Sequence, residues 1–278
     1  MTKFKHKNRY FVLLNSKDIV EHLKRFGYAI EPNVVPVEEC EKMASVLDEI
    51  ESEQRKAGTI SYSNTAQITI DNTHLIRPDI FLNKINIPNV LEVVSEVLGQ
   101  DFILSSVSAS RSGPDGGKNH HTDSRMPIRD FSNTIQLVAT LCLDDYTETN
   151  GATLVYPFSH NLGENEEVIR AQKNISGKIA AVAPKGSILY FLAQTLHDVG
   201  PNIDGKRRWG IIFGYNRWWI KPVYDFTQCG KEIFQKLTPI QKTLFGFTSK
   251  TPRYGGKRHY TRINIDELPQ DYEQAKNI

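Results

Sequence analysis

The sequence predicts an α+β protein whose core is mainly β, of the jelly-roll or cupin-like type, with buttressing helices near the N-terminus. Two observations predict this fold class. Up to Gly99 the apolar residues recur with the helical period, whereas after residue 102 they alternate with a period of two or form continuous apolar runs. The later runs are short and are separated by Gly, Pro and Asn turns, which is typical of antiparallel jelly rolls.

The elements of the first hundred residues follow from helix start and stop signals and from apolar stripes. Ser16 is placed to cap a first helix that Gly27 ends, and Pro36 opens a second. Pro88 and Gly99 bound a third helix, whose valines recur on one face. The expected order is a helix at 16–27, a strand at 28–35, a helix at 37–56, a polar loop or hairpin at 57–78 and a helix at 88–99.

The chain between residues 102 and 220 is expected to form strands. The segment 135–143 is almost wholly apolar, which indicates a central strand. The strands are expected at 102–111, 135–143, 153–156, 178–183, 187–191 and 209–215, with residues 120–123 extended. From residue 224 the pattern becomes helical and then basic at 250–262, so we expect an extension that packs on the core or helps to cover the cavity mouth.

Length and composition favour one domain. With 278 residues, of which 39% are hydrophobic, the chain can bury one substantial core. We therefore expect a single domain over 1–278, with its core at about 20–220 and a C-terminal extension at 224–278.

Charge and cysteine usage exclude several classes of partner. The 34 basic and 32 acidic residues give a net charge of +2, which provides no overall field for nucleic acid or a membrane surface. The apolar run at 10–14 is too short for a signal-peptide core, and no run reaches the length of a membrane span. Three widely separated cysteines fit reduced thiols, so we expect a cytoplasmic protein.

The most informative stretch is His121-Thr122-Asp123. In a strand, side chains two residues apart share a face, so His121 and Asp123 can point together into a cavity while Thr122 points away. With a distant histidine, His197, they would supply the two imidazoles and one carboxylate that hold Fe(II) on one face and leave the opposite positions open. The neighbouring His120 is expected to face the other way, as an outer or substrate-edge donor.

Two arginines follow the distal histidine. The sequence Lys206-Arg207-Arg208 leads directly into the apolar run at 209–213. An arginine here can enter the same cavity from a neighbouring strand and bind a dicarboxylate by a bidentate, charge-assisted contact. Arg207 and Arg208 are both candidates for this contact.

These pieces, in this order and spacing, resemble the phytanoyl-CoA dioxygenase-like family of Fe(II)/2-oxoglutarate oxygenases. The resemblance covers roughly residues 20 to 220. The motifs that carry it are Gly27-Tyr28, His121-Thr122-Asp123, Leu143-Asp144-Asp145, 150–154, Pro157-Phe158-Ser159-His160, Pro184-Lys185-Gly186-Ser187 and the segment from His197 to Arg208. The resemblance implies a double-stranded β-helix with Fe(II), 2-oxoglutarate and O2 as cofactors. It also implies iron ligation by His121, Asp123 and His197.

The family pattern also selects between the arginines and shows two departures. The family usually places its 2-oxoglutarate arginine eleven positions after the distal histidine, which selects Arg208 and turns Arg207 outward. Val199 stands where the family often has serine, and no tryptophan stands on the strand after the His-x-Asp motif. Thr140 and Gln136 are therefore expected to substitute in binding 2-oxoglutarate.

The predicted reaction is hydroxylation of a small polar or anionic metabolite, with release of succinate and CO2. Polar and basic residues outnumber large apolar ones around the expected mouth, and the candidate substrate contacts are Arg111, Asn119, His120, Arg125 and Arg217. The alternatives are the same oxidative chemistry directed to desaturation, epimerisation or cyclisation, a hydroxylase acting on a protein, and a non-catalytic jelly-roll that binds a metal or small ligand. Asp123 argues against halogenation, because related halogenases replace this carboxylate by a small residue.

Overall fold

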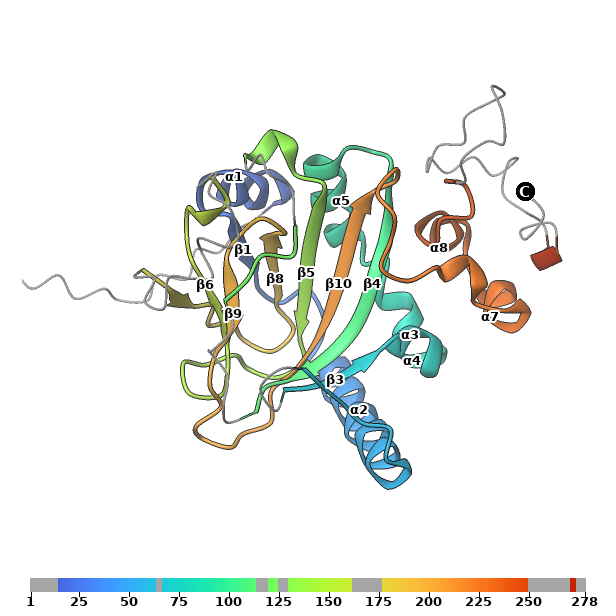
Figure 1. Ribbon diagram of the computed structural model, residues 1–278, viewed down its shortest axis with the longest axis horizontal. Helices are drawn as coiled ribbons and strands as arrows, with labels where there is room; N and C mark the ends of the chain where they lie inside the picture. Colours follow the sequence, from blue (N-terminus) through green and yellow to red (C-terminus); the bar gives the residue numbers. More distant parts are fainter. Residues whose placement is uncertain are drawn as a thin grey trace, which may run out of the picture.

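A computed structural model describes residues 15–63, 67–113, 120–124, 130–161, 177–249 and 271–273. Within these ranges the core consists of two facing antiparallel sheets (Figure 1). The larger sheet has the order β1-β8-β5-β10-β4-β3-β2, and the smaller has the order β7-β6-β9. The predicted α+β jelly roll is therefore confirmed.

The strands have the following bounds: β1 Tyr28–Glu31, β2 Ser61–Ser63, β3 Gln67–Asp71, β4 Phe102–Arg111, β5 Gln136–Cys142, β6 Thr153–Val155, β7 Ile179–Ala180, β8 Ile188–Leu192, β9 His197–Val199 and β10 Trp209–Arg217. The helices are α1 Ser16–Phe26, α2 Val37–Ala57, α3 Thr73–Ile76, α4 Pro78–Phe81, α5 Pro88–Leu98, α7 Lys231–Lys236 and α8 Pro239–Leu244. Short 3-10 turns lie at Leu82–Lys84, Phe131–Asn133, Ser159–Asn161 and Phe226–Gln228.

The strands of the larger sheet bury different side chains on their two faces. On β10 the residues Trp209, Ile211, Phe213 and Tyr215 join the main hydrophobic core, which they share with the apolar faces of α1, α2 and α5. The intervening residues of β10 face the smaller sheet, as the period of two requires. The helices thus buttress the outer face, and the space between the two sheets is left for a cavity.

The residue that caps the first helix lies one position earlier than the sequence predicted. The side chain of Asn15, and not that of Ser16, accepts the hydrogen bond from the Asp18 backbone N–H at 3.0 Å. The prediction at the other end is confirmed, because Gly27 adopts φ 82° and its N–H donates to the Leu23 carbonyl. A glycine is favoured here because a left-handed backbone costs little without a β-carbon.

Two predicted strands are shorter than expected. The strand from residue 28 ends at Glu31, because the N–H groups of Val34 and Val35 both donate to the Gly186 carbonyl in place of a strand partner. The strand predicted at 178–183 is reduced to β7. The polar segment at 57–78 contains the β2–β3 hairpin, which extends the larger sheet beyond β4.

The C-terminal extension packs on the outer face. Phe234, Leu244, Phe245 and Phe247 belong to the same hydrophobic core as the helices, and α7 and α8 lie on the side of β4 away from β10 (Figure 1). The single domain over 1–278 stays a prediction, and the basic segment 250–262 lies outside the described residues. No helix in the described ranges is long and apolar enough to cross a membrane.

Candidate metal and co-substrate site

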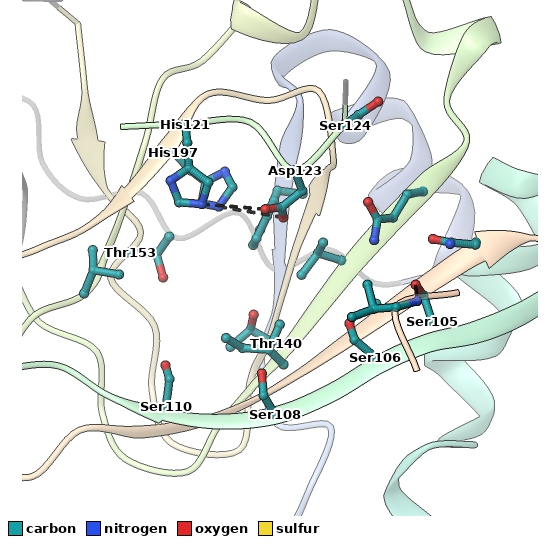
Figure 2. A pocket seen from close by; sticks show the side chains of 18 of the residues that line it. Ser105, Ser106, Ser108, Ser110, His121, Asp123, Ser124, Thr140, Thr153 and His197 are labelled. Carbon is teal, nitrogen blue, oxygen red and sulfur yellow. Dashed lines mark hydrogen bonds and ion pairs between the residues drawn. The ribbon is translucent and has the colours of Figure 1, made fainter. Parts of the chain in front are cut away.

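Three predicted ligand side chains meet at the opening between the sheets. One donor atom each from His121, Asp123 and His197 lies within 4.8 Å of the other two. The Asp123 carboxylate is 3.6 Å from His121 Nε2 and 3.8 Å from His197 Nε2, so both imidazole nitrogens face it (Figure 2). Two nitrogens and one carboxylate oxygen at such separations fit a single divalent ion bound on one face.

Backbone hydrogen bonds hold the two distant segments together at this point. His121 and His197 exchange both of their backbone N–H···O=C bonds, each 2.9 Å long. The Asp123 N–H then donates to the Ala193 carbonyl at 2.8 Å, which fixes the carboxylate beside the two rings. Thr122 is buried and turns away, with its hydroxyl donating to the Ser124 carbonyl. The predicted alternation of His121-Thr122-Asp123 is confirmed.

His197 is held in the form that binds metals. Its Nδ1 lies 3.0 Å from the Thr195 carbonyl, an acceptor that assigns the proton to Nδ1 and leaves the Nε2 lone pair facing Asp123. The ring also lies against Phe191, with centroids 4.5 Å apart. Burial lowers the pKa of His197 below its ordinary value, which favours the neutral imidazole that a metal requires.

A cavity of about 850 Å³ opens from the triad into the space between the sheets, and Arg208 lines it. Arg208 is only 2% exposed. Its guanidinium donates through Nε to the Gly151 carbonyl at 2.8 Å, through Nη2 to the same carbonyl, and through Nη1 to the Tyr146 hydroxyl at 3.2 Å. A guanidinium has five N–H donors, so one hydrogen on each terminal nitrogen remains available to a ligand.

Arg207 has a different environment from Arg208, and the comparison shows which of the two side chains points into the cavity. It forms ion pairs with Asp144 at 3.1 Å and with Asp48 at 2.9 Å. By contrast, no carboxylate of the described residues lies within ion-pair distance of Arg208. The structure therefore places Arg208 in the cavity and Arg207 outside it, as the eleven-residue spacing predicts.

The two predicted substitutes for the missing serine lie in different parts of the cavity. Thr140 is 5% exposed and lies next to Gly210 and Tyr146, close to the arginine. Gln136 pairs across the sheet with Asn216, eight residues along β10 from Arg208, which corresponds to about 26 Å of strand. Gln136, Thr140 and Arg208 all line the cavity, with Gln136 farther along β10 from the arginine than Thr140, and a contact of Gln136 with 2-oxoglutarate stays a prediction.

The remaining predicted substrate contacts do not meet in the cavity. Arg111 pairs with Glu51 at 2.9 Å and lines a separate surface cleft. Arg217 donates through Nε to the Thr134 carbonyl at 2.8 Å. Neither arginine lines the cavity of the triad, and neither does His120, whose ring lies 6.2 Å from that of Tyr156. The other two predicted contacts, Asn119 and Arg125, lie outside the described residues.

Sequence reasoning did not identify several polar residues that line the cavity. Ser106, Ser108 and Ser110 lie along β4 on the side opposite the triad (Figure 2). Their spacing of two was visible in the sequence, although nothing there showed which face of the strand they occupy. Thr153 on β6 and Tyr146 line the cavity as well.

Comparison with known proteins identifies the relatives of this chain. The family model described as phytanoyl-CoA dioxygenase (PhyH) matches residues 23–210. An uncharacterised protein of Mycobacterium tuberculosis is 26% identical over 180 residues, which are 61% of this chain and 64% of that protein. Dioxygenase aneA of Aspergillus aculeatus is 26% identical over 183 residues, or 62% and 59% of the two chains. In both cases the match spans less than two thirds of the relative.

Solved structures of low identity share the fold. HygX from Streptomyces hygroscopicus, solved with nickel and 2-oxoglutarate bound, has a TM-score of 0.61 at 16% identity, over 74% of this chain and 88% of its own. The non-heme alpha-ketoglutarate-dependent epimerase SnoN from nogalamycin biosynthesis has a TM-score of 0.59 at 16% identity, over 75% and 86%. AviO1 from Streptomyces viridochromogenes has a TM-score of 0.57 at 16% identity, over 75% and 98%.

Proposed function

Because the chain belongs to the phytanoyl-CoA dioxygenase family, we propose that it is a non-haem Fe(II)- and 2-oxoglutarate-dependent dioxygenase. Members of this family use Fe(II), 2-oxoglutarate and O2, and the His121-Asp123-His197 set matches that requirement in donor type and spacing. The reaction we propose is hydroxylation of a small polar or anionic metabolite, with release of succinate and CO2.

Arg208 is the observation that carries this proposal. An isolated buried cation is costly unless an anion or a hydrogen-bond network compensates it. The partners of Arg208 are a carbonyl and a hydroxyl, and both are neutral at physiological pH. A dicarboxylate bound at the triad with its far carboxylate at Arg208 would supply the missing charge through the two unused N–H groups.

The roles of the remaining residues follow from their positions. His121, Asp123 and His197 would hold the iron, and Thr195 would keep His197 in the tautomer that presents Nε2. When bound, Fe(II) and 2-oxoglutarate together supply the activation of O2 that a saturated C–H bond requires. Tyr146 would hold the Arg208 guanidinium in place, and Thr140 is positioned to contribute a hydroxyl near the carboxylate in place of the serine that Val199 replaces.

The substrate is proposed to be small and polar because polar side chains occupy much of the cavity lining. Besides Arg208, the cationic residue of the described lining is Lys221, which is exposed. An anionic substrate would therefore approach Lys221, since Arg111 and Arg217 lie elsewhere. We also propose a cytoplasmic location, because Cys40, Cys142 and Cys229 are all free thiols.

The proposal is tested by titrating 2-oxoglutarate into Fe(II)-loaded protein without O2, followed by measurement of succinate in the presence of O2 and a metabolite library. We expect saturable, metal-dependent binding of 2-oxoglutarate and succinate release that a substrate stimulates. Mass analysis of the product then distinguishes a gain of one oxygen from desaturation, epimerisation or cyclisation. Metal binding without any affinity for 2-oxoglutarate would contradict the proposal and favour a non-catalytic binding protein.

A further inference from the structure

The end of the cavity remote from Arg208 contains a buried amide oxygen that has no hydrogen-bond partner in the part of the chain that the structure describes. Asn216 is 4% exposed and lines the cavity. Its Oδ1 is fully buried and has no hydrogen-bond partner among the described residues. Buried polar atoms in native proteins are nearly always satisfied, so an exception at a cavity wall indicates an atom that a ligand completes.

Two further polar groups converge on the same place. Gln136 lies directly across the ladder from Asn216, and Ser106 lies opposite Gly214 on the other side of β10. A β-carbon added to Gly214 would stand 2.6 Å from Ser106 Oγ and 3.4 Å from Gln136 Nε2. The absence of a side chain at Gly214 therefore lets the Ser106 hydroxyl and the Gln136 amide pack directly over the β10 backbone, next to Asn216.

A β-bulge directs this end of β4 toward the cavity. The register between β10 and β4 shifts after Gly214, so that Gly214 pairs with Ser106 whereas Tyr215 pairs with Leu104. The extra residue, Ser105, also lines the cavity, and its hydroxyl accepts the Val223 N–H at 3.2 Å. Bulges frequently lie beside functional sites, where they redirect side chains.

Asn216, Gln136 and Ser106 are neutral, hydrogen-bonding groups, whereas Lys221, two residues before the Val223 that bonds Ser105, is exposed. Asn216 offers an acceptor, Gln136 a donor, and Ser106 can serve as either. Ser108 and Ser110 continue the same row along β4 below the triad (Figure 2). An acyl chain would leave these groups unsatisfied, and a carboxylate or phosphate would find no cation among the three. Several hydroxyl groups on one compact carbon skeleton would satisfy them together.

We propose that Asn216, Gln136 and Ser106 form the substrate subsite and select an uncharged polyhydroxylated group, such as a sugar or a cyclitol, with Asn216 Oδ1 accepting a hydrogen bond from a substrate hydroxyl. This inference rests on the proposed function, because Arg208 and the triad assign the other end of the cavity to 2-oxoglutarate and iron. It narrows the substrate from polar or anionic to neutral at this subsite.

The first test combines a substitution at Asn216 with the removal of single hydroxyl groups from the ligand, as in a double-mutant cycle. Fe(II)-loaded protein with 2-oxoglutarate is screened without O2, by thermal shift and calorimetry, against neutral hexoses, inositols and their singly deoxygenated analogues. For the wild type we expect one hydroxyl whose removal weakens binding about tenfold to a hundredfold. Asn216→Ala should weaken binding of the parent compound by a similar factor and should bind the parent and that deoxy analogue equally. A variant that keeps the wild-type preference would overturn the assignment.

The second test separates a ligand contact from a structural one. Gln241 is also 4% exposed, but its amide donates to the Leu82 carbonyl and to Asn86 and accepts the Thr238 N–H. Gln241→Ala should therefore lower the melting temperature of the ligand-free protein. Asn216→Ala should lower it much less or raise it, because it removes an oxygen that has no partner. Equal losses in the two variants would give Asn216 a structural role and overturn the proposal.

The possible results also distinguish this inference from the proposed function. If 2-oxoglutarate binds but only acyl-CoA thioesters, carboxylates or phosphates stimulate succinate formation, the subsite assignment fails and the dioxygenase remains. If no neutral probe binds, the subsite assignment fails as well. If 2-oxoglutarate itself does not bind, both proposals fall together.

Discussion

Gly210 and Tyr146 are packed so closely that a β-carbon on Gly210 would overlap the Tyr146 hydroxyl. That hydroxyl in turn accepts a hydrogen bond from Arg208, and the guanidinium lies 4.5 Å above the tyrosine ring. The absence of a side chain at position 210 therefore permits the contact that orients the arginine two residues earlier in the chain.

Gly210→Ala is expected to displace Tyr146 and raise the KM for 2-oxoglutarate. The matched variant Tyr146→Phe keeps the ring and removes only the hydroxyl, so its effect should be smaller, at about threefold to tenfold for one neutral hydrogen bond of roughly 1 kcal/mol. Steady-state kinetics with varied 2-oxoglutarate measure both. A KM unchanged by either variant would show that Tyr146 does not position the arginine.

Arg208→Ala should raise the KM for 2-oxoglutarate far more than the requirement for iron. Loss of a charge-assisted pair in a desolvated pocket costs about 2–5 kcal/mol, or roughly thirtyfold to several thousandfold. Arg207→Ala is the control, since Arg207 pairs with Asp144 and Asp48 outside the cavity. That variant should lose some stability and keep the KM. A larger KM effect at Arg207 than at Arg208 would refute the assignment.

His121→Ala and His197→Ala should each abolish turnover and weaken iron binding by more than about a hundredfold, because two of the three ligand side chains are imidazoles. The fold should persist, since the main core is apolar and lies on the other face of the larger sheet. Metal analysis and circular dichroism measure the two effects. The control is His120→Ala, which changes the adjacent histidine outside the cavity lining and should still bind iron. Loss of iron from the His120→Ala variant would mean that the metal ligands are misassigned.

His74 predicts an acid sensitivity of the fold. It is fully buried between Phe226 and Phe245, and neither ring nitrogen has a hydrogen-bond partner among the described residues. Burial lowers the pKa of His74 from 6.5 to about 3. Below pH 6.5 the histidine therefore binds a proton in the unfolded chain but not in the folded chain. The free energy of unfolding consequently decreases as the pH falls from 6.5 toward 3.

The slope of that loss is about 1.4 kcal/mol per pH unit, or roughly 2–3 kcal/mol between pH 6.5 and 4.5. His74→Phe should remove this component, and urea unfolding of both proteins at several pH values measures the difference. Curves that stay parallel from pH 6.5 to 4.5 would show that His74 does not bind its proton on unfolding.

Local patterns in the sequence predicted the larger part of this structure. The period of two placed His121 and Asp123 on one face, and the spacing that the family resemblance implies after His197 selected Arg208 over Arg207. The structure places these residues accordingly, because each placement depends on neighbours along one strand or on a fixed spacing, while their roles in binding iron and 2-oxoglutarate stay predictions. The position of Gln136 depends on the register between β5 and β10, which is set by pairing across the sheet and is not encoded in one segment.

Other features could not be predicted because they depend on contacts between distant segments. The bulge between β4 and β10 places both Ser105 and Ser106 at the cavity, although simple alternation would send one of them outward. The pairing of Arg111 with Glu51 on α2 brings together residues sixty positions apart. The sequence around an arginine near a strand end does not show whether its side chain binds a ligand or pairs with a carboxylate on a neighbouring helix.

The alternation on β4 has a consequence for how this protein can diversify. Ser106, Ser108 and Ser110 line the cavity, while Val107 and Ala109 between them are buried in the main core. The even-numbered positions of this strand thus determine the lining of the cavity, and the odd-numbered positions determine the packing of the core. A library that randomises only positions 106, 108 and 110 can therefore change the cavity lining while Val107 and Ala109 keep the sheet packed against the main core. Substrate preference could then change without loss of the fold.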